Sequence, residues 1–251
     1  TDADAGASAT YTISGGADSG DFAISSGVLT FASTPDHESP ADADTNNEYI
    51  VIVQVSDGTN TDTQTITVTV TDVNEAPVIT SNSGGSTASI SYAENATSAV
   101  TTVTSTDVDA GASATYTISG GADSGDFSIS SGVLTFSSTP NYESPADDGT
   151  NNEYIVIVQV SDGTNTDTQT ITVTVTDVND NSPVITSNSG GSTASISYAE
   201  NATSSVTTVT STDADAGASA TYTISGGADS GDFAISSGVL TFASTPDHEN
   251  P

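Results

Sequence analysis

A long internal repeat dominates this sequence of 251 residues. The segment that begins Thr1-Asp-Ala-Asp-Ala-Gly returns at Thr106, with Val108 in place of Ala3, and it returns again at Thr212. The intervals are therefore 105 and 106 residues. A unit of about 100 residues can bury a core of its own, whereas the repeats of about 20 to 50 residues that build solenoids cannot. The repeat length predicts tandem domains in a linear array.

The repeat boundaries predict three domains, the middle one complete and the outer two cut short. They cover residues 1–76, 77–182 and 183–251. Asp72-Val-Asn-Glu-Ala-Pro77 forms the first linker, and Asp177-Val-Asn-Asp-Asn-Ser-Pro183 forms the second, which is longer by one residue. We expect the natural protein to extend beyond both ends.

The charge of the chain excludes several classes of partner. It carries 33 acidic residues, no lysine and no arginine, for a formal charge of −33. Phosphate backbones and anionic lipids are bound through Lys and Arg, so we expect no nucleic-acid partner and no membrane insertion. Divalent cations are the expected counter-charge. Cysteine is absent, which excludes disulfides and thiolate metal sites.

Alternating apolar and polar residues predict β-strands. In 168–176, Ile171, Val173 and Val175 alternate with threonines, as in a strand with one buried face. The run 154–160 is apolar at most positions and predicts a central strand covered on both faces, and residues 162–167 between the two strands have hairpin-turn chemistry. Shorter strands are predicted at 116–118, 127–129 and 133–136. The pattern indicates an all-β, antiparallel Greek-key sandwich and argues against disorder.

Acidic residues recur at fixed places near the predicted domain ends. Four groups repeat: Tyr92-Ala-Glu94, Asp107-Val-Asp109, Asn141-Tyr-Glu143 and the linker itself. In this order and at this spacing they resemble the cadherin family, whose repeats carry P-E-N, D-x-D, D-R-E and D-x-N-D-N motifs. The strand 154–163 resembles the family's Y-x-L-x-V-x-A-x-D-x-G strand, which places Asp162 at a calcium-binding position.

The resemblance implies about three Ca²⁺ ions at each junction between domains. Oxygen ligands suit this ion. For the first junction the residues carried over are Asp36, Glu38, Asp72, Asn74, Glu75, Asp107, Asp109 and Asp162. For the second they are Glu94, Glu143, Asp177, Asn179, Asp180, Asn181, Asp213 and Asp215. Their counterparts in the incomplete outer repeats are Asp2, Asp4, Asp57, Glu200, Asp247 and Glu249.

Three positions depart from the family pattern. The position that is Asp36 in the first repeat is Asn141 in the middle repeat. In the first linker, Glu75-Ala76 stands at the position of Asp180-Asn181 in the second linker. The position of the arginine in D-R-E is His37, Tyr142 or His248 in the three repeats, and a position that accepts tyrosine argues against a metal-binding or catalytic histidine.

Other acidic residues fit no ligand position of the family. We interpret one set as solvated surface residues that keep the chain soluble: Asp42, Asp44, Asp147 and Asp148. We interpret the other set as turn residues: Asp18, Asp21, Asp123 and Asp126.

We expect an extracellular, cell-surface function without enzymatic activity. The near-identical repeats favour a long, microbial adhesin in which calcium stiffens a spacer that holds a cell to its neighbour, a surface or a matrix. Identical repeats of neighbouring chains are possible further partners, and the alternative is a structural filament or sheath without a receptor role. A carbohydrate-binding module lacks support because there is no tryptophan. Paired carboxylates could suggest glycoside hydrolysis, but three copies of one active site would be unusual.

Overall fold

The computed structural model describes residues 8–249, and these residues form short strands joined by turns and three single-turn 3-10 helices. Each 3-10 helix occupies the same place in its repeat, and the three span Ser19–Asp21, Ser124–Asp126 and Ser230–Asp232. None of the helices in the described part of the chain is long and apolar enough to cross a membrane. The chain divides into two compact units, and the division runs through the middle repeat.

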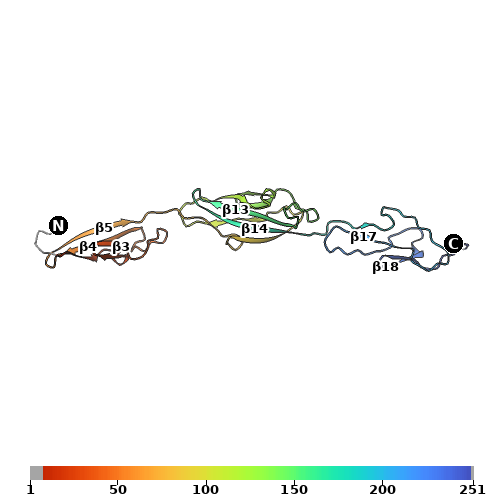
Figure 1. The fold of residues 1–251 in the computed structure, drawn as a ribbon, viewed down its shortest axis with the longest axis horizontal. Helices are drawn as coiled ribbons and strands as arrows, with labels where there is room; N and C mark the ends of the chain where they lie inside the picture. Colours follow the sequence, from red (N-terminus) through yellow and green to blue (C-terminus); the bar gives the residue numbers. More distant parts are fainter. Residues whose placement is uncertain (1–7, 250–251) are drawn as a thin grey trace. The chain divides into compact units, whose positions relative to one another are not determined.

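The first unit holds the first repeat and one end of the middle repeat. The first repeat has one sheet in the order β1-β4-β5 and a pair of strands, β2 and β3 (Figure 1). From the middle repeat, β6 pairs with β9. The bounds are β1 Thr10–Gly15, β2 Phe22–Ser25, β3 Val28–Phe31, β4 Glu48–Ser56, β5 Thr61–Thr69, β6 Val78–Ile79 and β9 Ser105–Thr106.

The second unit holds most of the middle repeat, which is a two-sheet sandwich. One sheet has the order β10-β13-β14-β7 and the other has the order β11-β12-β8. The bounds are β7 Thr87–Ala93, β8 Thr101–Thr102, β10 Thr115–Gly120, β11 Phe127–Ser130, β12 Val133–Phe136, β13 Glu153–Ser161 and β14 Thr166–Thr176. The strands predicted from alternation are confirmed.

Aromatic side chains join the two sheets of the middle repeat. The ring of Tyr154 on β13 lies edge-on to Phe127 and Phe136, which belong to the other sheet. Tyr92 on β7 packs on Phe136 from the far edge of the first sheet. Such pairs stabilise a core beyond the area that they bury. Their arrangement confirms the tandem β-sandwich class.

Two details of the middle repeat differ from the sequence-based expectation. β13 is central in its sheet, but Ile155 is 39% exposed, so the strand is covered on one face only. β7 runs parallel to β14, from Thr87 opposite Thr170 to Ala93 opposite Thr176, in a sheet expected to be wholly antiparallel. Strand direction here depends on how a segment about 80 residues earlier reaches the edge of the sheet, which alternation does not encode.

The third repeat, also in the second unit, has fewer strands. β15 pairs with β17, and a second sheet has the order β16-β19-β18. The bounds are β15 Val184–Ile185, β16 Thr207–Thr208, β17 Ser211–Thr212, β18 Phe233–Ser236 and β19 Val239–Phe242. Residues 193–199 repeat the sequence of β7 but form no strand.

Two of the aspartates interpreted as surface residues are buried. Asp147 is 2% exposed and Asp42 is 3% exposed, so that interpretation is wrong for both. Asp147 accepts hydrogen bonds from the backbone N–H groups of Asn151 (2.9 Å) and Asn152 (3.1 Å), and Asp123 accepts them from Asp148 and Ile155. Backbone donors compensate the loss of water around these carboxylates. They hold the polar loop before β13 in place.

Candidate metal centres

Carboxylates from four chain segments meet within the first unit. Glu38 lies in the loop between β3 and β4, while Asp72 and Glu75 follow β5. Asp107 and Asp109 follow β9, and Asp162 follows β13. We call Glu38, Asp72, Glu75, Asp107, Asp109 and Asp162 the first acidic cluster. Oxygens of Glu38, Asp72, Glu75 and Asp109 lie within 4.8 Å of one another, and so do oxygens of Asp107, Asp109 and Asp162.

Hydrogen bonds fix the linker within the first acidic cluster. Asn74 donates from Nδ2 to Asp162 (2.8 Å), and Asn165 donates from Nδ2 to the backbone oxygen of Asn74 (2.8 Å). The backbone N–H of Glu75 donates to Asp109 (3.0 Å). The backbone N–H groups of Thr164 and Asn165 hold the pKa of Asp162 below its ordinary value, with a smaller contribution from Asn74. Asp162 is therefore kept ionised at the centre of these contacts.

The second acidic cluster lies within the second unit and comprises Glu94, Glu143, Asp177, Asp180 and Asp215. Oxygens of Glu94, Glu143 and Asp177 lie within 4.8 Å of one another, as do oxygens of Glu143, Asp180 and Asp215. Glu94 is 2% exposed, and its two oxygens accept backbone N–H groups of Tyr142 and Val178, each at 2.8 Å. Glu94 thereby ties the segment after β14 to the loop that carries Glu143.

Asparagines position the remaining carboxylates of the second acidic cluster. Asn181 donates from its side chain to Asp180 and to Asp215, both at 2.8 Å, and its backbone N–H also donates to Asp215. The Asn181 side chain is the main cause that lowers the pKa of Asp215. Asn95 donates to the other oxygen of Asp180 (2.6 Å).

Several carboxylate oxygens in the clusters are buried without a hydrogen-bond donor among the described residues. They are Oδ2 of Asp107, Oδ1 of Asp109, both oxygens of Glu143 and Oδ1 of Asp177. A buried polar atom left unpaired costs about 1–3 kcal/mol, and more when it is charged. Because the chain has no lysine or arginine, no side-chain ammonium or guanidinium group can neutralise them. A bound cation would compensate these oxygens.

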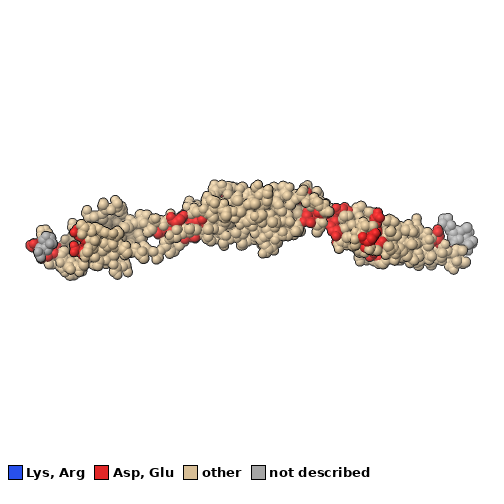
Figure 2. Space-filling model, turned by 180° about the vertical axis from the view of Figure 1, so that it is seen from behind, with Lys and Arg blue, Asp and Glu red and all other residues tan. Residues whose placement is uncertain are grey.

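Desolvation and neighbouring carboxylates raise the pKa of two members of the clusters. Loss of water raises the pKa of Glu143, and the neighbouring Glu94 raises it further. The pKa of Glu75 is also raised, first by desolvation and then by its contact with Asp109. A bound divalent cation would stabilise the ionised carboxylates and so oppose both shifts. Figure 2 shows carboxylates gathered in patches on the face that is drawn, with wide areas between them that carry none.

Calcium fits this donor set. All members offer carboxylate, amide or backbone oxygen, which is the ligand chemistry that Ca²⁺ prefers.

His37 is not among the metal ligands expected from the sequence, yet its Nδ1 lies 2.9 Å from Glu38 and 3.7 Å from Asp72. The contact with Glu38 raises the pKa of His37. No sequence signal indicated this contact, because the equivalent position in the middle repeat is Tyr142.

The structure places the other predicted ligands beside the clusters or away from them. Asp36 accepts the N–H groups of Glu38 and Ser39, and Asn141 likewise accepts the N–H of Ser144. This turn needs one side-chain oxygen, which explains why Asn can replace Asp there. Asp213 accepts the N–H of Asp215, and Asn179 is exposed in the linker.

The predicted ligands of the incomplete junctions accept backbone N–H groups from their own repeats. Asp57 accepts the N–H groups of Thr59 and Asn60, Glu200 accepts that of His248, and Asp247 accepts that of Glu249. Glu200 and Glu249 are exposed. Asp2 and Asp4 lie outside the described residues.

Comparison with known proteins identifies the fold. Over 96% of its length the chain matches the protocadherin gammaB7 EC3-6 cis-dimer structure, with a TM-score of 0.65 and 23% identity. The fold is that of cadherin extracellular repeats. Human CDH23 EC21-23 matches 96% of the chain with a TM-score of 0.61 and 22% identity. Mouse protocadherin-24 EC1-3 also matches 96% of the chain, with a TM-score of 0.61 and 26% identity.

The match to these cadherin repeats is one of structure. The chain spans 60% of the gammaB7 chain, 80% of the CDH23 chain and 78% of the protocadherin-24 chain. No protein-family model matches the sequence. No curated protein matches it either.

Proposed function

We propose that this chain is a calcium-stiffened spacer in the extracellular part of a cell-surface adhesin. The observation that carries the proposal is the set of buried carboxylate oxygens that have no donor in the described part of the chain, all of them on predicted calcium ligands. The structural likeness to cadherin extracellular repeats supports an extracellular, adhesion-type role. The near-identity of the repeats favours a long microbial surface protein that grew by duplication.

The predicted ligands would hold about three Ca²⁺ ions at each acidic cluster. Asp36 and the six members of the first acidic cluster supply seven carboxylates, which nearly balance the six positive charges of three ions. When bound, calcium supplies charge neutralisation and oxygen coordination. The chain's own residues do the rest: Asn74 and Asn165 orient the linker, and Asp162 and Asp109 present oxygens to it.

Calcium would stiffen the array because each cluster draws on residues before, within and after a linker. With the ion bound, bending the linker would pull ligands out of coordination. Without it, the like charges would repel one another and loosen the same contacts. Calcium-binding extracellular modules bind with dissociation constants of about 10⁻⁴ to 10⁻³ M, so the sites would fill outside cells.

Solution scattering with and without calcium tests this proposal. The 251-residue chain should have a larger radius of gyration, a higher unfolding temperature and greater resistance to protease in millimolar Ca²⁺ than in chelator. Magnesium at equal ionic strength is the control, because its preference for a compact octahedral shell fits many-carboxylate sites poorly. Equal dimensions and equal stability in calcium and in chelator would refute calcium stiffening.

A structural filament or sheath is the second candidate function. It is favoured by the similarity to a structure titled as a cis-dimer, since lateral contacts between identical repeats are what a filament requires. Imaging of the protein on its native cells separates the two. Single projections with a distinct tip support the adhesin, and bundled chains without tips support the filament.

A further inference from the structure

Two small cavities of the same construction lie in the middle and third repeats, both within the second unit. They enclose about 180 Å³ and about 190 Å³. The cavity of the middle repeat is bordered by Tyr92 on β7, by residues 96–98 and by residues 135–139, which begin within β12. The cavity of the third repeat is bordered by the same positions, which are Tyr198, residues 202–204 and residues 241–245.

Hydrogen bonds hold the walls of each cavity in place. In the middle repeat the backbone N–H of Asn95 donates to the Pro140 oxygen (3.0 Å), and the Tyr92 hydroxyl donates to the Ser98 oxygen (2.7 Å). The third repeat has the same two bonds, at 2.9 Å and 2.7 Å. The walls are therefore set before a ligand arrives, which lowers the entropic cost of binding.

A pair of aromatic rings gives each cavity one apolar side. Tyr92 and Phe136 have ring centres 5.2 Å apart and planes inclined at 49°, and Tyr198 and Phe242 have values of 5.1 Å and 50°. The third repeat has fewer strands than the middle repeat, yet its cavity keeps the same volume and the same ring geometry. The cavity is thus a local feature of the loop after β7 and the segment after β12.

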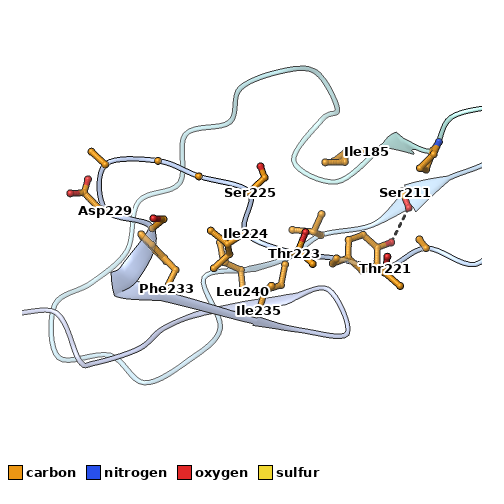
Figure 3. Close-up of a pocket in the computed structure, with 18 residues that line it drawn as sticks. Ile185, Ser211, Thr221, Thr223, Ile224, Ser225, Asp229, Phe233, Ile235 and Leu240 are labelled. Atoms are coloured by element: carbon orange, nitrogen blue, oxygen red, sulfur yellow. Dashed lines mark hydrogen bonds between the residues drawn. The ribbon is translucent and has the colours of Figure 1, made fainter.

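The charge of the lining limits the ligand. No acidic residue is among the described residues that line the two small cavities, although the chain has 33 of them. By contrast, Asp229 lines the larger pocket of the third repeat that Figure 3 shows, and Asp62 lines a hollow of the first repeat. A cation would meet no carboxylate in the small cavities, and an anion would meet no ammonium or guanidinium group. The ligand that fits is neutral.

Hydroxyl groups make up much of the remaining lining. In the middle repeat they belong to Thr97, Ser98, Ser137, Ser138 and Thr139, and none of these five hydroxyls forms a hydrogen bond with another described residue. A hydroxyl can both donate and accept, so this lining suits a ligand that carries several hydroxyls of its own. A wholly apolar ligand would cover these groups without giving them partners, at a cost in free energy.

We propose that each of these cavities binds one neutral hexose ring. The Ser and Thr hydroxyls would meet the hydroxyl groups of the sugar, and Tyr92 and Phe136 would lie against the C–H groups of its ring. Drug-sized ligands occupy pockets of about 300–1,000 Å³, so a cavity of about 180 Å³ suits a ligand of a single ring. The absence of tryptophan argues against a wide aromatic platform, but a small cavity needs none.

Repetition of the cavity would give the array several weak sugar sites. A single site should have a dissociation constant of about 1–10 mM, because one hexose has few atoms to contact. Several sites on one chain raise the effective affinity for a polymer that presents the same sugar repeatedly. This binding goes beyond the spacer role, because the repeats themselves would contact a neutral polysaccharide.

Saturation-transfer NMR with D-glucose, D-galactose and D-mannose tests the proposal on the 251-residue chain in millimolar Ca²⁺. At least one of these neutral hexoses should receive saturation from the protein. The matching uronates, D-glucuronate, D-galacturonate and D-mannuronate, are the controls. The uronate of the hexose that binds should bind at least about ten-fold more weakly, because its carboxylate meets no cationic group in a chain with a formal charge of −33.

Removal of one hydroxyl from each cavity tests the site. Thr97→Val combined with Thr203→Val keeps the shape of the side chains and should weaken hexose binding about ten-fold. Ser137→Ala is the matched control, because its counterpart in the third repeat is Ala243 and the cavity there has nearly the same volume. The control should change binding by less than about two-fold.

Filling both cavities tests the site without relying on a single hydroxyl. Ala96 and Ala202 line the two cavities at equivalent positions. Ala96→Leu combined with Ala202→Leu should abolish the saturation transfer, because the added carbons occupy the space of the sugar ring. Melting curves verify that each variant folds.

Three results would overturn the proposal. One is the absence of saturation transfer to all three hexoses at tens of millimolar. Another is equal binding of the hexose and its uronate. The third is binding that survives the two leucine substitutions, or that falls as much in Ser137→Ala as in the double valine variant. None of these results depends on whether calcium extends the chain, so the spacer function is judged separately.

Discussion

The side-chain amide of Asn74 donates a hydrogen bond of 2.8 Å to the carboxylate of Asp162, although 88 residues separate them in the chain. Asn74 belongs to the linker after β5, and Asp162 lies in the turn between β13 and β14. This contact brings the linker to the turn that completes the first acidic cluster. It also gives the cluster a test with an internal control, because the chain contains the same turn twice.

Asp162→Asn should weaken calcium binding to the first acidic cluster at least about ten-fold, because it removes one negative charge from the ligand set. Asp57→Asn is the control. Asp57 accepts the same two turn N–H groups as Asp162, in an identical Asp-Gly-Thr-Asn sequence. The control should leave the first cluster's affinity unchanged. Calorimetric titration of calcium measures both, and an equal loss in the two variants would mean that the turn, and not the cluster, matters.

Gln169→Ala should destabilise the second unit by about 1–3 kcal/mol. Gln169 is fully buried, accepts from Asn82 Nδ2 (3.0 Å) and donates to the Gly85 oxygen (2.9 Å). Gln64 has the same sequence neighbours but is exposed, so Gln64→Ala should change stability by less than about 0.5 kcal/mol. Denaturant unfolding of both variants compares them. A similar cost in each would contradict the difference in burial.

Gly121→Ala should cost more than about 2 kcal/mol. Gly121 has a φ of +108°, and an added Cβ would lie against the Ile155 carbonyl oxygen and 2.6 Å from the Val156 Cα. Gly125→Ala is the matched control in the same loop, where a Cβ would meet nothing within 4 Å. The control should be nearly neutral in a thermal melt. Loss of folding in the control as well would point to the loop's flexibility and not to the close approach.

Asp126→Asn should raise the unfolding temperature slightly at pH 7 and have no effect near pH 3. Desolvation first, and then Asp123 and Asp147, raise the pKa of Asp126 in the folded chain. A raised pKa means that the ionised carboxylate disfavours folding, and this penalty vanishes below the unfolded pKa of about 3.9. Melting curves recorded across this pH range measure the effect. A gain that persists unchanged at pH 3 would contradict the electrostatic cause.

Asp123→Ala, in the same turn as Asp126, should instead lower the stability of the fold. Asp123 accepts two backbone N–H groups at 2.7 Å, so its removal should cost about 2 kcal/mol at pH 7. Asp148→Ala is the control, because Asp148 lies in the same loop and its side chain is exposed. The same melting experiment compares the two variants, and equal stability would remove the structural role assigned to Asp123.

Much of the candidate site could be read from sequence because its residues sit in short motifs that repeat. Glu94, Glu143 and Asp177 lie near predicted domain ends, and the structure brings them within 4.8 Å. Which oxygens lack a donor could not be read in this way, since that depends on the backbone N–H groups that each carboxylate meets. The contact of His37 with Glu38 was missed for the same reason.

The sequence by itself determined the repeat, the strands and the turns, because alternation and turn chemistry act between near neighbours. Tertiary structure decided which of two identical segments is covered. Ile66 and Ile171 have the same neighbours in sequence, yet one is half-buried and the other fully buried. It also decided that β7 runs parallel to β14 and that Asp147 is buried. Burial and strand partners depend on segments far along the chain, and a local pattern carries no information about them.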